Sequence, residues 1–195
     1  SPDEMMRKDA DGSDIACDPN GPLIAQVFKA RIDPFVARMN FLRIFSGTVR
    51  KDSTVIDQET GKEVKFGAIH IAQGNHLEPV DHGEAGDIVV VTKLEGLHVG
   101  DSLSTDGRRL PPIHFPKPMV GLAVAPKTSA DQQKISGSLA KLHEEDPTIE
   151  ITRDAQTHEM VVHGMSDLHL NLLLHRVEKR DKLGMTTLKF PFMIC

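Results

Sequence analysis

Residues 126–181 read PKTSADQQKISGSLAKLHEEDPTIEITRDAQTHEMVVHGMSDLHLNLLLHRVEKRD. This stretch decides the fold of its half of the chain, because two helical patterns enclose two alternating, strand-like patterns. In each helical pattern the apolar residues recur every three or four positions, which places them on one face of a helix. The two apolar stripes are Ile135, Leu139 and Leu142, then Leu170, Leu173, Leu174 and Val177. Each stripe predicts an amphipathic helix packed against a core.

Both predicted helices carry sequence signals at their ends. Ser129 with Gln132 three positions later has the spacing of a capping box. Asp146-Pro147 should end the first helix, because a residue that precedes proline disfavours the helical conformation. Ser166 can accept hydrogen bonds from the backbone N–H groups that open the second helix, and Gly184 is expected to terminate it.

Four segments around the predicted helices are expected to be strands, because in three of them apolar side chains alternate with small or polar residues and the fourth follows a tight turn as a hairpin partner. They are Met119–Ala125, Thr148–Arg153, His158–His163 and Met185–Phe190. With the helices they give the order β-α-β-β-α-β, which packs two helices on one face of a four-stranded antiparallel sheet. The sequence therefore predicts an α+β, ferredoxin-like sandwich for residues 119–192.

The stretch from Leu23 to Phe115 shows only short strand patterns separated by turn residues. Residues 88–91 form the apolar run Ile-Val-Val-Val, which is typical of a strand covered on both faces. Several short strands at close spacing, without a helical pattern, predict a small closed β-barrel for residues 21–115. Alternation places on one face Ile24, Phe28 and Ile32 in the first strand, and Met39, Phe41 and Phe45 in the second.

The chain thus divides into two predicted domains, an all-β barrel followed by the α+β sandwich. Prolines at positions 111, 112, 116 and 118 predict a stiff connector between them. Residues 1–20 are polar and acidic with almost no apolar periodicity, so we expect a flexible tail or linker there.

Composition limits the possible partners. Of the 195 residues, 39% are hydrophobic and 26% charged, which is typical of a folded, soluble chain. Aromatic residues make up only 4% and Trp and Tyr are absent, so the composition offers no aromatic array for stacking single-stranded bases. The formal net charge of −5 is not that of a typical nucleic-acid-binding protein.

Any contact with RNA would have to come from a local basic patch. The candidates lie within one short stretch and are Lys29, Arg31, Arg38, Arg43, Arg50 and Lys51. The alternative is that these side chains form the solvated rim of a β-sheet.

Motifs for independent chemistry are absent. The chain lacks the phosphate-binding sequence GxxxxGKS/T and the nucleophile elbow GxSxG, so we expect no nucleotide hydrolysis and no bound cofactor. Ten histidines include no HExxH pattern, and His169 and His175 diverge around a helix, so we predict no metal site. The acidic run Glu144–Asp146 lies at the unfavourable end of the helix dipole, which hints at a partner surface. The alternative is an ordinary solvated helix end.

Two cysteines, Cys17 and Cys195, make no disulfide framework and suggest a reducing compartment. No apolar run approaches the ~20 residues that span a bilayer, and no signal-peptide pattern opens the chain. We therefore expect a cytoplasmic protein without membrane contact.

Several motifs in order resemble bacterial elongation factor G. Its third domain is similar to residues 123–128 (AVAPKT), 130–134 (ADQQK), 139–148 (LAKLHEEDPT) and 164–170 (GMSDLHL). Its second, β-barrel domain is similar to residues 18–23 (DPNGPL), 33–36 (DPFV), 43–48 (RIFSGT), 84–88 (EAGDI) and 100–103 (GDSL). The chain departs from the family at Ala37 and Ser166, where glycine is usual, and at residues 192–195.

The resemblance implies a translation factor section. In this family a GTPase domain, which binds GTP and Mg²⁺, precedes the barrel, and the barrel contacts small-subunit rRNA. The third domain helps to convert GTP hydrolysis into tRNA–mRNA movement, and fusidic acid binds in the cleft that these domains share. By motif match, Asp146, Thr148 and His169 would lie on or near that cleft. The alternative for them is a core-supporting histidine and a capped turn.

The first functional hypothesis is a non-catalytic, monomeric middle section of such a factor, whose partners are the ribosome, through its small-subunit rRNA and protein, and the GTPase domain. In the second, the chain is a standalone RNA- or protein-binding adaptor, or a paralogue that acts in ribosome recycling or protection. An enzyme that uses the histidines is a third and more distant alternative.

Overall fold

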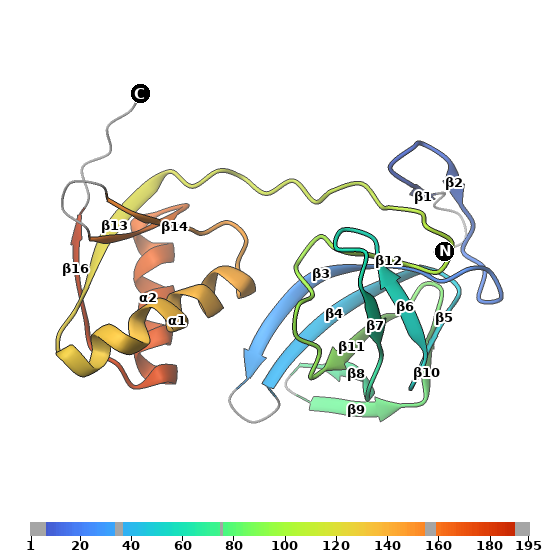
Figure 1. The fold of residues 1–195 in the computed structure, drawn as a ribbon, viewed down its shortest axis with the longest axis horizontal. Coiled ribbons are helices and arrows are strands. Elements are labelled where there is room, and N and C mark those ends of the chain that lie inside the picture. Colours follow the sequence, from blue (N-terminus) through green and yellow to red (C-terminus); the bar gives the residue numbers. More distant parts are fainter. Residues whose placement is uncertain (1–6, 34–36, 75, 155–158, 190–195) are drawn as a thin grey trace. The chain divides into compact units, whose positions relative to one another are not determined.

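The computed structural model describes residues 7–33, 37–74, 76–154 and 159–189 (Figure 1). The chain divides into two compact units, Ser1–Ile113 and His114–Cys195. In the described residues, the first unit is built from strands and the second combines four strands with two helices. Parts of the predictions lie outside the described residues, namely positions 1–6, positions 34–36 of the DPFV motif, the strand start at His158 and the segment from Phe190 onward.

Most strands of the first unit are short, and β3 and β4 are the long central pair. The strands are β1 (Arg7–Lys8), β2 (Asp14–Ile15), β3 (Ile24–Asp33), β4 (Ala37–Ser46), β5 (Thr48–Arg50), β6 (Thr54–Asp57), β7 (Glu63–Lys65), β8 (Ile69–Gln73), β9 (His76–Val80), β10 (His82–Glu84), β11 (Ile88–Thr92) and β12 (Ser102–Ser104). Eight of them form one antiparallel sheet in the order β7-β6-β12-β3-β4-β11-β8-β9. Two-stranded pairs, β10 with β5 and β1 with β2, complete the unit.

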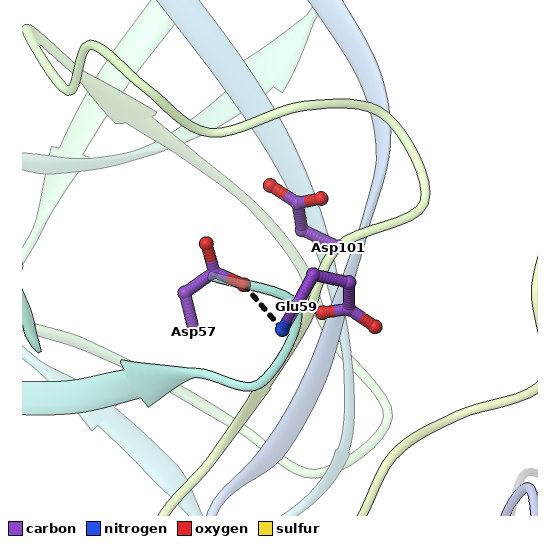
Figure 2. A group of neighbouring side chains, drawn as sticks. All are labelled: Asp57, Glu59 and Asp101. Atoms are coloured by element: carbon purple, nitrogen blue, oxygen red, sulfur yellow. Dashed lines mark hydrogen bonds between the residues drawn. The ribbon is translucent and has the colours of Figure 1, made fainter. Parts of the chain in front are cut away.

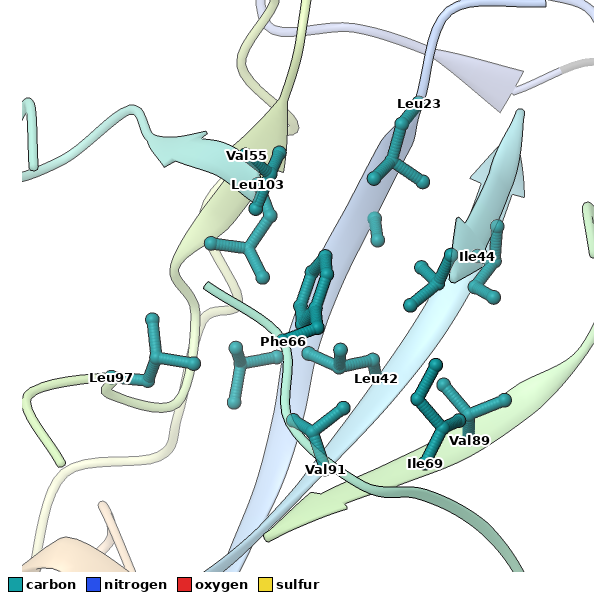
Figure 3. Packing of buried hydrophobic residues seen from close by; sticks show 13 residues of the cluster. Leu23, Leu42, Ile44, Val55, Phe66, Ile69, Val89, Val91, Leu97 and Leu103 are labelled. Atoms are coloured by element: carbon teal, nitrogen blue, oxygen red, sulfur yellow. The ribbon is translucent and has the colours of Figure 1, made fainter. Parts of the chain in front are cut away.

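The eight-stranded sheet curls around an aliphatic core with Phe66 among its side chains (Figure 3). Phe66 is fully buried, and its backbone donates to the Ser53 carbonyl and accepts from the Asp52 N–H at 2.9 Å each. These bonds fold the segment between β7 and β8 inward, so one aromatic ring fills the space that neighbouring aliphatic chains leave. The unit is the predicted β-barrel.

Alternation along the sequence does not identify the core residues of β3 and β4. The core contains Ala25 and Val27 from β3 and Leu42 and Ile44 from β4, whereas Phe28 is 37% exposed. Register shifts interrupt the β3–β4 pairing at Ile24/Ala25 and again between Val27 and Lys29. Each shift inserts an extra residue into the ladder and reverses the side on which later side chains point. Simple alternation along the sequence therefore selects the wrong residues.

Residues 7–20 differ from the flexible tail that we expected. β1 and β2 pair as a ribbon, and the Asp9 side chain accepts from the backbone N–H groups of Asp11 and Ser13 at 3.0 and 2.8 Å. Ile15 is buried in a small apolar cluster against Ile24 and Leu110. Burial of this one aliphatic side chain and the Asp9 turn fix a segment whose composition is otherwise that of a linker.

The second unit has the predicted β-α-β-β-α-β order. Its elements are β13 (Val120–Pro126), α1 (Ser129–Glu145), β14 (Glu150–Arg153), β15 (Met160–Gly164), α2 (Asp167–Asp181) and β16 (Met185–Lys189). The antiparallel sheet has the order β14-β15-β13-β16, which is the ferredoxin-like arrangement. Both apolar stripes of the helices are buried against it. Among the described residues, no helix is long and apolar enough to cross a membrane.

Two helix ends lie slightly away from the predicted positions. The N-cap of α1 is Thr128 rather than Ser129, because its hydroxyl accepts from the Asp131 N–H at 3.2 Å and donates to the Asp131 carboxylate at 2.7 Å. Helix α2 ends at Lys182 in a left-handed conformation, with φ +50°, and not at Gly184. The next residue, Leu183, enters the core, which forces the chain to turn one position after the helix. Ser166 caps α2 as predicted.

Gly47, between β4 and β5, has no room for a side chain. Its φ is +76°, and a Cβ atom there would lie 2.6 Å from Leu23 Cα and 2.7 Å from Leu23 N. Gly61, in the turn between β6 and β7, has a similar φ of +69° but nothing within 4 Å of a Cβ. The two positions therefore share backbone strain and differ in backbone contact.

We expect Gly47→Ala to destabilise the barrel by about 3 kcal/mol or more, because the clash with Leu23 adds to the cost of a left-handed residue. Gly61→Ala, the matched control, should cost only about 1 kcal/mol. Urea unfolding followed by circular dichroism measures both. Equal losses for the two variants would show that the Leu23 contact is unimportant.

Candidate functional site

One carboxylate joins three elements of the second unit. Asp146 ends α1, where its backbone N–H donates to the Leu142 carbonyl at 3.0 Å. Its Oδ1 accepts from the Thr148 N–H at 3.0 Å and from the Thr148 hydroxyl at 2.6 Å, just before β14. Its Oδ2 lies 3.0 Å from His169 Nε2 in the first turn of α2. The structure therefore brings together all three residues that the resemblance singled out.

The orientation of His169 follows from its surroundings. Its backbone N–H donates to the Ser166 hydroxyl at 3.1 Å, which is the N-cap bond of α2. Its Nδ1 is positioned to accept from the Met165 N–H, at 3.4 Å. This pattern assigns the proton to Nε2, which donates to Asp146. The helix cap and the carboxylate thus hold the ring from both sides.

The same contacts set the charge of Asp146. Burial by itself would raise the pKa of the Asp146 carboxyl, but the hydrogen bonds from Thr148 and His169 outweigh burial and hold this pKa below its ordinary value. The Asp146 and His169 side chains remain about one quarter exposed, at 27% and 26%. The group is therefore a fixed anion that a neighbouring molecule can still reach.

Two apolar side chains that sequence reasoning missed lie on the same helix. Leu168 is 69% exposed and Leu172 is 60% exposed, both outside the buried stripe of α2. They could have been found as apolar residues off the predicted stripe, one turn apart on a surface that should be polar. Leu168 directly precedes His169 in the chain.

Two carboxylates of the acidic run, those of Glu145 and Asp146, have partners within the unit. Glu145 accepts from Arg180 at 2.9 Å, with side chains only 13% and 10% exposed, and Arg180 also contacts Asp181 at 3.0 Å. Asp146 accepts the three hydrogen bonds described above. Their contacts within the unit account for both carboxylates, so the unfavourable helix-end position does not require an external partner.

The six basic candidates do not form one patch. Arg38 points toward the barrel interior, where it donates to the Asn40 side chain and the Leu97 carbonyl. Arg50 is the last residue of β5, which belongs to a different sheet, and Lys51 follows that strand. Arg43 is half-buried in β4, and its cross-strand partner in β3 is Gln26.

Lys29 and Arg31, by contrast, are exposed two residues apart on β3 and are paired with Phe41 and Met39 of β4. The Lys29 ammonium lies 5.2 Å from the centre of the Phe41 ring, a cation–π contact. Phe28 meets Phe41 edge to face, with ring centres 6.3 Å apart. We call Phe28, Lys29, Arg31 and Phe41 the basic–aromatic face. The composition did not predict the basic–aromatic face, because two aromatic side chains are enough to form it when folding places them next to the cations.

A third polar cluster was also missed by the sequence reasoning, which weighed only histidines as metal ligands. Oxygen atoms of Asp57, Glu59 and Asp101 lie within 4.8 Å of one another in the barrel (Figure 2). Asp57 accepts from the Glu59 N–H at 3.0 Å, and Glu59 accepts from the Ser102 N–H at 2.7 Å. Asp101 accepts from the His98 N–H at 2.6 Å. These bonds tie the turn after β6 to the start of β12.

Burial raises the pKa of the Asp101 carboxyl, and the negative charges of Asp57 and Glu59 raise it further. The hydrogen bond from the His98 backbone N–H lowers this pKa but does not outweigh them. A carboxyl with a raised pKa in the folded protein costs stability once pH rises above the ordinary value. Asp101→Asn should therefore raise the urea midpoint at pH 7, and the gain should disappear as pH falls toward 3.8, the ordinary value. Urea titrations across this pH range test the sign. A loss of stability at pH 7 would contradict it.

Asp146 should behave in the opposite way. Because its folded pKa is lowered, its ionised form contributes stability above pH 3.8, which is lost as pH falls through the folded value. Asp146→Asn should cost about 2 kcal/mol at pH 7, since hydrogen bonds to a charged acceptor are lost or weakened. The difference from the parent chain should shrink below pH 3.8. A constant difference at all pH values would exclude the charge as its cause.

Comparisons with known proteins agree with this architecture. The family model for Elongation factor G domain 2 matches residues 22–106, and that for Elongation Factor G, domain III matches residues 115–189. Elongation factor G from Orientia tsutsugamushi, strains Boryong and Ikeda, is 40% identical over 161 residues, covering 82% of this chain and 23% of the relative.

A crystal structure of a protein from Thermus thermophilus aligns with a TM-score of 0.77 and 30% identity, covering 87% of this chain and 26% of that one. The chain therefore spans about a quarter of the length of these relatives. Two consecutive family matches fall on the barrel and on the sandwich, in the order expected from the motifs. The chain belongs to the elongation factor G family and carries its second and third domains.

Proposed function

We propose that this chain is the middle section of a translation factor and couples GTP hydrolysis to ribosomal translocation. GTP and Mg²⁺ would be bound by a GTPase domain elsewhere in the parent protein, so this section performs no chemistry of its own. The factor would act in the cytoplasm as a monomer, contacting small-subunit rRNA and protein. Support comes from the family matches over both units and from relatives of which this chain covers 23%.

The Asp146 network is the observation that carries the proposal. A domain that transmits movement must hold its own helices and strands rigidly together. Otherwise the movement deforms the domain and is not passed on. Here the end of α1, the approach to β14 and the start of α2 meet at one carboxylate. Charge-assisted hydrogen bonds are roughly twice as strong as neutral ones, so this joint resists deformation.

The joint is also accessible, which a contact for a neighbouring domain requires. Asp146 and His169 keep a quarter of their side chains exposed. Leu168 adds an apolar side chain that is 69% exposed next to them. A polar pair beside an apolar contact is typical of an interface that forms and separates. We propose that the GTPase domain contacts this surface and that fusidic acid binds there, as the resemblance implies for Asp146, Thr148 and His169.

The proposal can be tested with Asp146→Asn in the full-length factor on ribosomes. Tenfold slower tRNA–mRNA movement is expected, about the effect of 1.4 kcal/mol, while GTP hydrolysis in a single turnover stays unchanged. The same variant, Thr148→Ala and His169→Ala should each reduce inhibition by fusidic acid. Rapid-mixing kinetics with fluorescent tRNA and labelled GTP separate the two steps.

Two control variants isolate the cause. Glu150→Gln removes one exposed negative charge close by on β14, and Ile135→Val weakens the core of the same unit without touching the joint. Both controls should translocate at the parental rate. If Asp146→Asn also translocates normally, or if Ile135→Val slows movement equally, the joint has no specific role in coupling.

A further inference from the structure

A cavity of about 180 Å³ opens beside the basic–aromatic face, between two hairpins of the barrel. Arg31, Met39 and Phe41 line it from the β3–β4 hairpin, and Ala72 and Leu77 line it from the β8–β9 hairpin. Met39 is 5% exposed, so the cavity has a buried apolar wall with an arginine at its edge. It lies on the outside of the barrel, because the core side of β4 carries Leu42 and Ile44.

The size of the cavity limits what can enter. Pockets for drug-sized ligands measure about 300–1,000 Å³, and this one is smaller. It can take one planar ring system, but not a complete nucleotide or a folded peptide segment. Its thioether, aliphatic and aromatic walls suit the faces of a heterocyclic base.

Charges of both signs surround the cavity. Arg31 and Asp33 both line it, and the Asp33 carboxylate would repel a phosphate that entered. Lys29 lies next to the lining, with its ammonium held over Phe41 at 5.2 Å, and Arg31 is exposed on the same strand. One cation in the lining, one beside it and a carboxylate in the lining favour a ligand whose apolar part enters while its anionic part stays near the two cations.

We propose that this surface binds an unpaired nucleotide of RNA, with its base in the cavity and the flanking phosphates on Lys29 and Arg31. The inference rests on the proposed function, which gives the chain an RNA partner, and deepens it by naming the form of RNA recognised. Sequence-specific and loop RNA recognition generally uses bases turned out of the helix and placed against aromatic side chains. Paired bases stay stacked in a duplex and cannot enter.

The test uses the 195-residue chain and an RNA hexamer with 2-aminopurine at a central position. Binding is followed by anisotropy, and entry of the base by quenching of 2-aminopurine fluorescence. Addition of the chain should quench the 2-aminopurine of the single strand further, whereas the fluorescence of the same hexamer paired with its complement, already low through base stacking, should not change. Lys29→Ala and Arg31→Ala should each reduce the salt slope of binding by about one and weaken affinity about tenfold.

Ala72→Met is designed to fill the cavity without changing any charge. It should abolish quenching and weaken binding of the single strand about tenfold, as loss of one stacked base does. Arg50→Ala is the matched control, because it removes one exposed cation at a separate sheet and should change nothing. Circular dichroism spectra of all variants report whether the barrel is intact. If Ala72→Met does not fold, Leu77→Lys, which places a cation in the cavity wall, replaces it with the same expected loss of quenching.

Four results would overturn the inference. They are equal quenching of single strand and duplex, normal quenching in the filled variant, an equal loss of affinity in Arg50→Ala, and tight binding of an acidic peptide in place of the hexamer. Failure here with slowed translocation in Asp146→Asn would leave the proposed function standing. The expected RNA result with normal translocation in Asp146→Asn would overturn the coupling role alone.

Discussion

The second unit depends on a partly buried anion that is fully supplied with donors. Asp146 sits where a helix must end, at the terminus whose dipole disfavours negative charge. Thr148, in the turn before β14, and His169, in the first turn of α2, overcome this cost with three hydrogen bonds. The carboxylate therefore links the end of α1 to the turn that leads into β14 and to the start of α2. The Asp146 carboxylate, although unfavourably placed at a helix C-terminus, therefore connects three parts of the unit.

Asp101 is a buried aspartate whose carboxylate accepts fewer hydrogen bonds than that of Asp146, and its pKa is raised instead of lowered. It is more deeply buried, accepts from the His98 backbone N–H and lies close to two further carboxylates. Burial and repulsion then exceed the hydrogen bond, and its pKa moves in the opposite direction from that of Asp146. The two aspartates are chemically identical, so the number and sign of their neighbours decide whether burial fixes an anion or favours its protonation.

How much of the fold the sequence could predict depended on the type of element. The stripes of α1 and α2 were predictable because a helix in this sandwich buries one side only, and Ile135 or Leu173 cannot change side without a break in the helix. In β3 and β4 the register shifts reverse the parity, and the ribbon residue Ile15 covers part of the outer face. Because both faces of these strands are partly covered and the register shifts twice, alternation of apolar residues does not reveal which side chains enter the core. The β-barrel class was therefore predictable, but its core residues were not.

The candidate sites divide in the same way. Asp146, Thr148 and His169 entered as candidates through the family resemblance, since 23 residues separate Asp146 from His169 and no spacing rule connects them. The cavity beside Lys29 and Arg31 joins two hairpins that are well separated in the chain, and a net charge of −5 conceals the local excess of cations. Salt largely screens charges that lie farther away than a Debye length, about 8 Å, so the nearest side chains dominate the local potential. Strand register, rather than the net charge of the chain, decides where cations lie on this face, and here the bulge at Phe28 directly precedes Lys29 on the open face of the sheet.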